Sequence, residues 1–162
     1  MIDFTKSKQY TLSIRLSTDG FSFSIYNPIH DDSLSIIEKE INASSSLTAN
    51  LKTLFHESDF LSQPYKRVVI VMAGKRFTIA PLELFEEEQA ELLFYHNHQK
   101  KENETVLYNI LRKNNVAVIF GIDKSAQTFL NEQYPEARFY SQSTPFIDYF
   151  SVRSRLGNSK KM

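Results

Sequence analysis

Alternating apolar and polar residues near the amino terminus predict two β-strands joined as a hairpin. Every second residue is apolar from Tyr10 to Leu16, and the same period returns from Phe21 to Ile25. Thr18-Asp19-Gly20 separates the two runs, and Asp-Gly in this position favours a tight hairpin turn because glycine accepts positive φ angles. A weaker pattern from Leu34 to Glu40 predicts a third strand.

The middle of the chain changes from a period of two to helical spacing and back. Apolar residues then recur three and four positions apart, which predicts a helix capped by Ser44 to Ser46 and ended before Pro64. The uninterrupted apolar run from Val68 to Met72 is rich in β-branched residues and predicts a central strand covered on both faces. A short strand is expected at Phe77 to Ile79.

Pro81 and the glutamates that follow it predict a helix that carries Leu84 and Leu92 among its apolar residues. The acidic side chains between residues 86 and 91 are interpreted as a solvated helix face. A polar loop is expected from His96 to Glu104. The remaining expected elements are a second hairpin from Thr105–Leu111 and Val116–Ile122, a helix capped by Asp123 and ended before Pro135, a strand at Ala137–Tyr140, and a last helix from Ser143 to about Leu156.

These elements fit one α/β domain over residues 1–162, with an α+β arrangement as the alternative. We expect a mixed sheet that opens with the hairpin and carries helices packed on it. Residues 76–122 are predicted to form an inserted subdomain made of a helix and a hairpin, and residues 157–162 a flexible tail. A chain of this length buries roughly two-thirds of its unfolded surface, which is enough for one core.

The amino-acid composition argues against nucleic-acid and membrane partners. Lysine plus arginine and aspartate plus glutamate number 19 each, so no overall positive field attracts nucleic acid or an anionic membrane. The chain has no cysteine, no signal-peptide pattern, and no apolar stretch of the ~18 residues needed to span a bilayer. We therefore expect a cytoplasmic protein with no nucleic-acid partner and no membrane partner.

No sequence motif predicts catalysis, a metal ion or a cofactor. The four glycines lie too far apart for a phosphate loop or a dinucleotide fingerprint. His96 and His98 have the spacing of a ligand pair, but a metal site needs further ligands, so we interpret them as surface loop histidines. Gly74-Lys75-Arg76 is explained better as a charged turn between strands than as a phosphate site.

Three stretches carry a resemblance to a known fold. They are LSIRLSTDGFSFSI at residues 12–25, VVIVM at 68–72 and RFTIAPLELF at 76–85. Together with the order of the predicted helices and strands, these stretches resemble the first half of the actin-like ATPase (ribonuclease-H-like) fold. More closely, the chain is similar to an uncharacterised bacterial family of roughly twice its length with that fold. The resemblance covers about residues 10–150 and implies that the chain corresponds to the amino-terminal half of the family.

The resemblance implies where a phosphate would bind. Active members of the superfamily carry an acidic residue late in the first strand, followed by a small-residue turn whose backbone approaches nucleotide phosphates. Arg15 occupies the acidic position here, and Ser17 stands where glycine is usual. The candidate phosphate-binding remnant is therefore Arg15, Ser17, Thr18, Asp19 and Gly20. An arginine binds phosphate but does not anchor a magnesium ion, so ATP hydrolysis is not expected.

The second half of the fold, which supplies the other phosphate loop and the adenine pocket in active relatives, does not follow the last predicted helix. Either the chain is a truncated product, or another copy or a partner supplies the missing surface. Both expectations are compatible with the sequence.

Two functional hypotheses follow. The first is a non-catalytic interaction or scaffold domain on a degenerate actin-like fold, with a protein partner or a homodimer and no cofactor. The candidate interface is an aromatic patch on the last helix, formed by Phe146, Tyr149, Phe150 and Val152; the alternative is that this helix packs on its own sheet and buries the same residues. The second hypothesis is a weak nucleotide-binding protein.

Overall fold

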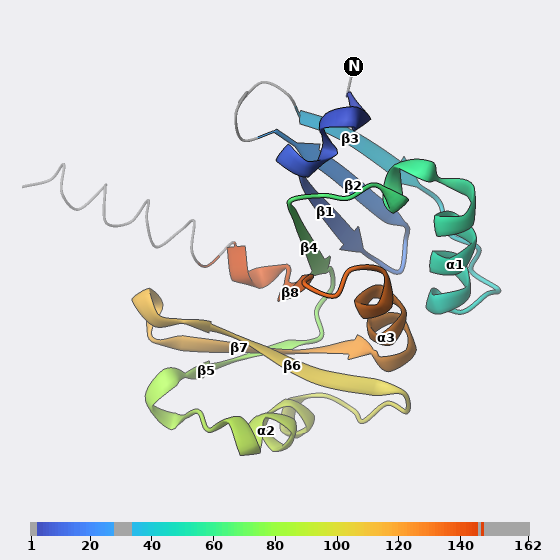
Figure 1. Ribbon diagram of the computed structural model, residues 1–162. Coiled ribbons are helices and arrows are strands. Elements are labelled where there is room, and N and C mark those ends of the chain that lie inside the picture. The colour runs from blue at the N-terminus through green and yellow to red at the C-terminus, as the bar shows by residue number, and fades with distance from the viewer. Residues whose placement is uncertain (1–2, 28–33, 146, 148–162) are drawn as a thin grey trace, which may run out of the picture. The chain divides into compact units, whose positions relative to one another are not determined.

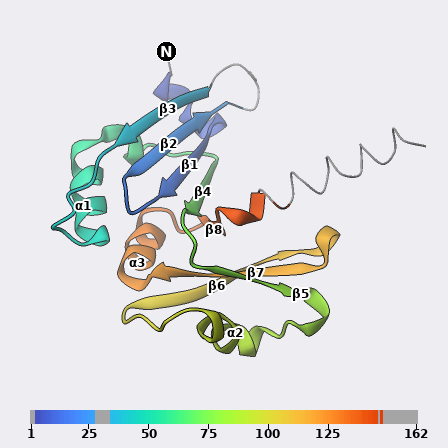
Figure 2. The ribbon, with the colours of Figure 1, turned by 180° about the vertical axis from the view of Figure 1, so that it is seen from behind.

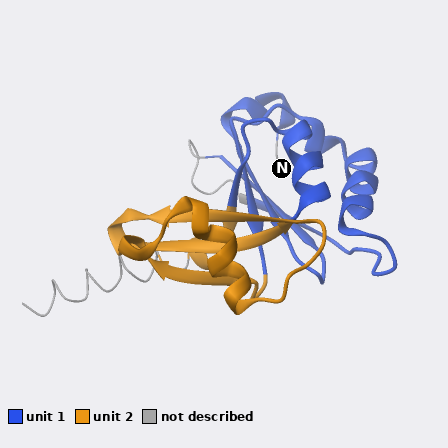
Figure 3. Ribbon diagram, turned by 90° about the horizontal axis from the view of Figure 1, so that it is seen from below, with its two compact units in different colours: residues 1–73, 123–139 blue, residues 74–122, 140–162 orange. Residues whose placement is uncertain are grey.

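The computed structural model describes residues 3–27, 34–145 and 147 (Figure 1). The chain divides into two compact units, coloured separately in Figure 3. Unit 1 takes residues 1–73 and 123–139, and unit 2 takes residues 74–122 and 140–162. Unit 2 therefore contains the predicted insertion at 76–122 together with a later segment. The assignment of residues 1–162 to a single domain stays a prediction, and the predicted tail at 157–162 lies outside the described residues.

A mixed five-stranded sheet in the order β3-β2-β1-β4-β8 forms the basis of unit 1. β1 pairs antiparallel with β2 and parallel with β4, and β2 pairs antiparallel with β3. The predicted opening hairpin and mixed sheet are thus confirmed. The strands of this sheet are β1 (Thr11–Leu16), β2 (Phe21–Tyr26), β3 (Leu34–Lys39), β4 (Arg67–Met72) and β8 (Arg138–Ser141).

One face of this sheet carries the core of unit 1. The side chains of Leu12, Ile14 and Leu16 are at most 1% exposed because alternate residues of a strand point to the same face. Helices α1 (Leu47–Glu57) and α3 (Lys124–Gln133) contribute buried leucines to the same cluster and contact each other, as Figures 1 and 2 show. Short 3₁₀ turns, η1 (Phe4–Gln9) and η2 (Asp59–Ser62), complete this unit.

Both helices of unit 1 begin at a side-chain cap. The hydroxyl of Ser46 accepts a hydrogen bond from the amide of Ala49 at 3.1 Å, and the carboxylate of Asp123 accepts one from the amide of Ala126 at 2.9 Å. Each cap satisfies a backbone donor that has no partner within the helix. The predicted caps are therefore confirmed.

Unit 2 contains a three-stranded sheet in the order β5-β7-β6 and the helix α2 (Ala90–Asn97). Ala80, Ala90, Phe94 and Ile119 form a buried cluster between this helix and the sheet. The strands are β5 (Phe77–Pro81), β6 (Glu104–Leu111) and β7 (Val116–Asp123), with the 3₁₀ turn η5 (Arg112–Asn114) between the last two. The predicted second hairpin is present.

The helix predicted from Pro81 is wrong in its extent. β5 continues through Pro81, two 3₁₀ turns follow as η3 (Leu82–Leu84) and η4 (Glu87–Gln89), and α2 begins only at Ala90. The physical reason is local, since Phe85 and Glu86 adopt extended backbone angles and interrupt a helix at that point. The ring of Phe85 instead packs on Tyr108, with ring centroids 5.1 Å apart.

The strand predicted at Val68 to Met72 is present as β4, although its two faces differ. Val68 and Ile70 are buried, whereas Val69 and Val71 are half-buried. The last predicted helix begins at Ser143, and all of it after residue 147 lies outside the described residues. Within the described part of the chain, every helix is too short or too polar to cross a bilayer.

Candidate functional site

The turn between β1 and β2 holds the residues of the candidate phosphate-binding remnant. The amide of Ser17 donates to the carbonyl oxygen of Gly20 at 3.1 Å and closes the turn, and the amide of Asp19 donates to the hydroxyl of Ser17 at 3.1 Å. Both the hydroxyl group and the backbone amide of Ser17 therefore form hydrogen bonds within the turn itself. Thr18 and Asp19 are exposed at its tip.

The strand pattern divides these residues between two hollows. Leu16 lies on the buried face of β1, so Arg15 lies on the opposite, outward face, where it pairs in register with Ser22 of β2. Ser22 in turn pairs in register with Glu38 of β3. A row from Arg15 to Glu38 thus crosses three strands on the face away from the core.

A polar hollow of about 450 Å³ lies over this row. We define it by its charged residues, because they decide what it attracts. Two are cationic and three are anionic: Arg15, Lys39, Asp19, Glu38 and Glu40. An excess of carboxylates opposes the binding of a phosphate group.

A neutral hollow of about 300 Å³ lies where β1 and β4 end and α1 begins. Ser17 and Thr18 line it together with apolar residues such as Met72, and no charged side chain takes part. Asn50 of α1 shapes its wall through two hydrogen bonds to the backbone of Asn42. The side-chain NH₂ of Asn50 donates to the carbonyl oxygen of Asn42 at 3.0 Å, and the side-chain oxygen of Asn50 accepts from the backbone amide of Asn42 at 2.7 Å. Such a site suits a small uncharged group better than a phosphate.

The residues of the predicted phosphate-binding remnant therefore share one turn but line two different hollows. Arg15, Asp19 and Gly20 line the polar hollow, Thr18 lines the neutral hollow, and Ser17 lines both. Phosphate binding by these residues stays a prediction.

Gly20 is the residue of this turn whose substitution has the clearest consequence. A Cβ atom at this position would lie 2.9 Å from the carbonyl oxygen of Lys39, which belongs to the backbone and does not move independently. We expect Gly20→Ala to lower the free energy of unfolding by about 1–3 kcal/mol, because β2 and β3 must separate. Urea denaturation measures this loss. Thr18→Ala in the same turn is exposed and serves as the control; an equal loss in both variants would contradict the close approach.

An ion pair forms the polar centre of unit 2. The guanidinium of Arg76 donates to both carboxylate oxygens of Glu104, at 2.6 and 3.0 Å, and to the carbonyl oxygen of Gln99 at 3.0 Å. The hydroxyl of Tyr95 donates to Glu104 at 3.0 Å, and Arg76 lies over the ring of Phe94. Burial, followed by this hydrogen bond, raises the pKa of Tyr95. Arg76 is thus engaged inside the unit, in line with its interpretation as a strand-turn residue.

The two histidines with ligand-like spacing take different positions. His96 is exposed on α2, whereas His98 is half-buried and stacks on Phe94 with ring centroids 4.6 Å apart. The Nε2 atom of His98 lies 2.9 Å from the carbonyl oxygen of Phe77. The interpretation of both as surface loop residues is therefore wrong in a different respect for each: His96 is at the surface but belongs to a helix, and His98 follows the helix but is half-buried in a packing role. Within the described ranges, no group of three or more potential ligands is placed to hold a metal ion.

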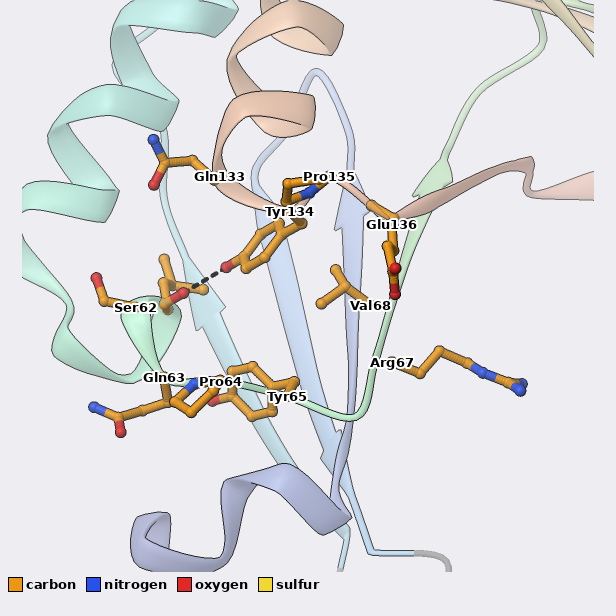
Figure 4. Close-up of a pocket in the computed structure, with 12 residues that line it drawn as sticks. Ser62, Gln63, Pro64, Tyr65, Arg67, Val68, Gln133, Tyr134, Pro135 and Glu136 are labelled. Carbon is orange, nitrogen blue, oxygen red and sulfur yellow. Dashed lines mark hydrogen bonds between the residues drawn. The ribbon is translucent and has the colours of Figure 1, made fainter.

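A further hollow, the tyrosine hollow, lies in unit 1 between residues 61–68 and 133–137 (Figure 4). The hydroxyl of Tyr134 donates to the carbonyl oxygen of Leu61 at 2.6 Å, and that of Tyr65 donates to the carbonyl oxygen of Phe60 at 2.6 Å. Both rings are thereby fixed on either side of the hollow. Sequence reasoning missed this site, because Tyr134 and Leu61 are 73 residues apart and no local motif links them.

These tyrosines predict a loss of stability at high pH. Burial raises the pKa of Tyr65 from 10.0 to about 12, and burial also raises the pKa of Tyr134. A pKa that is raised by folding gives stability that is complete below the unfolded pKa and is lost as pH rises through the folded value. We therefore expect the free energy of unfolding to fall above about pH 10. Urea titrations at about pH 8 and about pH 11 test this, and the double variant Tyr65→Phe, Tyr134→Phe should lose less. Equal losses would contradict the assignment.

The predicted interface residues Phe146, Tyr149, Phe150 and Val152 lie outside the described residues. The described part nevertheless exposes two leucines that the sequence analysis assigned to the apolar positions of the helix predicted from Pro81. Leu84 and Leu92 are 70% and 71% exposed. Glutamates 86–88 and Glu91, which lie between these leucines in the sequence, are exposed as well.

Comparison with known proteins gives a family and a fold. A family model described as a protein of unknown function (DUF3822) matches residues 1–162. A crystal structure from Bacteroides thetaiotaomicron VPI-5482, described as a protein with actin-like ATPase fold and unknown function, is 80% identical in sequence and superposes with a TM-score of 0.91. The match covers 96% of this chain and 61% of that one, so this chain spans less than two-thirds of the length of that protein. A search of curated protein sequences finds no match. The predicted resemblance and fold class are confirmed.

Proposed function

The chain belongs to DUF3822, a family of proteins of unknown function, and we propose that it acts as a non-catalytic protein-interaction domain on a degenerate actin-like fold. The observation that carries the proposal is the position of Arg15. Its side chain stands on the outward face of β1, in register with Ser22 and in the same hollow as three carboxylates. A guanidinium in place of an acid cannot anchor a magnesium ion, and the carboxylates around it repel a phosphate chain.

Exposed apolar surface supports the interaction part of the proposal. Leu84 and Leu92 leave most of their side-chain surface in water, and exposed glutamates flank them in sequence. Single exposed leucines are common in folded proteins, but exposed apolar surface rimmed by polar residues also marks protein-interaction sites. A protein partner or a second copy of the chain would cover them.

A weak nucleotide-binding function is the second candidate. The neutral hollow at the ends of β1 and β4 favours it, because ligands of open α/β sheets bind beyond the carboxyl ends of the strands. The hydroxyl group of Thr18 would meet an uncharged part of the ligand there, because the hollow has no cation for the phosphates.

Calorimetry with magnesium–ATP distinguishes the two candidates. We expect no saturable heat with ligand at up to about 1 mM, a concentration that detects even weak sites. The control is Arg138→Ala, an exposed arginine outside the turn. Saturable binding that Thr18→Ala (neutral hollow) or Arg15→Ala (polar hollow) abolishes and Arg138→Ala leaves intact would overturn the proposal in favour of nucleotide binding.

Light scattering coupled to size exclusion tests the homodimer form of the proposal. We expect the apparent mass to rise between about 5 and about 100 μM, the range in which weak interfaces assemble. Phe150→Glu should return a folded monomer if the last helix forms the interface, and Leu92→Glu should do so if the acidic segment forms it. A constant monomeric mass would contradict self-association and would favour a separate protein partner.

A further inference from the structure

The tyrosine hollow is fixed by hydrogen bonds within unit 1. The hydroxyl of Ser7 donates to the carbonyl oxygen of Pro64 at 2.8 Å and holds one wall. On the other wall, the amide of Ala137 donates to the carbonyl oxygen of Tyr134 at 3.0 Å and closes a turn with Pro135 and Glu136 at its centre. The hollow measures about 530 Å³, within the usual size of a small-molecule site. A hollow built in advance loses little entropy when it binds.

The walls of the hollow present aromatic carbon rather than hydroxyl groups. The two tyrosine hydroxyls are occupied by the carbonyl oxygens of Phe60 and Leu61, as described above, so only the rings of Tyr65 and Tyr134 are available to a ligand. Val68 also lines the hollow, to one side of the two rings in Figure 4, and adds an apolar side chain. Aromatic and aliphatic carbon of this kind suits the apolar part of a ligand.

The charged residues of the hollow favour a positively charged group on such a ligand. Glu136 is exposed, and within the described residues it forms no ion pair. In the view of Figure 4 its carboxylate lies on the same side of the hollow as Val68, while the guanidinium of Arg67 extends away from both tyrosine rings. The charge nearest the apolar wall is therefore negative.

We propose that the tyrosine hollow binds an organic cation with an apolar body, in which an ammonium or guanidinium group meets Glu136 and the alkyl part meets Val68 and the two rings. Such a group is carried by a free alkylamine or by a lysine or arginine side chain. The proposal does not depend on the interaction function proposed for the chain.

Methyl NMR of the full chain tests the proposal with three matched probes: n-butylammonium, n-butanol and butyrate. We expect saturable shifts of the Val68 methyl signals with n-butylammonium at a dissociation constant of about 1–10 mM, a range reasonable for a ligand of so few atoms. Neither the neutral nor the anionic probe should saturate these shifts. Equal binding of n-butanol, or preferred binding of butyrate, would overturn the proposal.

Two charge variants act in opposite directions. Glu136→Gln should weaken n-butylammonium at least about threefold, and Arg67→Gln should strengthen it, because one removes an attraction and the other a repulsion. Both residues are exposed, so both variants should fold. Glu132→Gln on α3 is the control, because it leaves both charged side chains of the hollow in place and should not change the affinity for n-butylammonium. Unchanged affinity in Glu136→Gln, or weakening in Arg67→Gln, would contradict the assigned role of the carboxylate.

The source of the cation is distinguished by a fourth probe, the blocked peptide acetyl-Ala-Lys-Ala-amide. Tighter binding of this peptide than of n-butylammonium assigns the hollow to a side chain of a partner protein, and weaker binding assigns it to a free amine. Failure of both cations to bind would overturn the proposal as a whole, without bearing on the calorimetric test of the proposed function.

Discussion

Glu104→Ala is expected to lower the free energy of unfolding by about 3 kcal/mol, because it breaks the ion pair at the centre of unit 2. The side chain of Glu104 is 7% exposed and holds both Arg76 and Tyr95. Its removal leaves a guanidinium and a phenol without their acceptor, inside a site lined by the ring of Phe94. Since the Arg76 side chain keeps 27% exposure, water recovers part of the loss, and the cost stays below that of a fully buried broken pair.

Chemical denaturation of the purified chain measures this loss, and Glu102→Ala is the matched control. Glu102 is exposed in the turn just before β6, and its substitution should change the unfolding free energy by less than about 0.5 kcal/mol. Hydrogen exchange then locates the effect, because the amides of α2 and β6 should lose protection before those of β1 and β4. Equal losses for Glu104→Ala and Glu102→Ala would contradict a structural role for the ion pair.

Local signals predicted most of unit 1. The two-residue period before and after Asp19-Gly20 is enough to define β1 and β2, because each strand buries one face and the turn accepts few other residues. The caps Ser46 and Asp123 mark the starts of α1 and α3 in the same way, since each satisfies a donor within three residues. Features that depend only on residues a few positions apart can therefore be predicted from the sequence alone.

Contacts distant in sequence explain what could not be predicted. The ion pair joins Arg76 to Glu104 across 28 residues, and nothing near either residue indicates the other. The helix expected at Pro81 has suitable composition throughout, but Phe85 packs against Tyr108 of β6 and the backbone there is extended. Packing with a later strand outweighed local helix propensity.

The candidate phosphate site shows a signal that was present but unused. Arg15 falls at a polar position of the alternating pattern, which already places it on the face of β1 opposite Leu16 and the core. The family resemblance grouped it with Thr18, and this brought together side chains that line different hollows. In a strand, residues next to each other in sequence are separated by the sheet itself.

Phe23→Ala is expected to lower the free energy of unfolding by about 4 kcal/mol. Phe23 is fully buried on the core face of β2, and its ring meets the edges of Phe21 and Phe60 at centroid distances of 6.5 and 5.6 Å. Truncation removes these contacts and leaves a cavity among residues of β2 and η2, which the rigid sheet cannot fill. Ser24, the next residue along, points to the outward face and pairs in register with Ser13.

Urea denaturation of Phe23→Ala and Ser24→Ala compares the two faces of one strand directly. Ser24→Ala should change the unfolding free energy by less than about 0.5 kcal/mol, because its side chain is outside the core. If Phe23→Ala does not accumulate as a folded protein, Phe23→Leu replaces it, with an expected loss of about 1 kcal/mol. Similar losses at positions 23 and 24 would show that both faces of β2 are covered in solution. The outward row from Arg15 to Glu38 would then be an interface rather than an open polar surface.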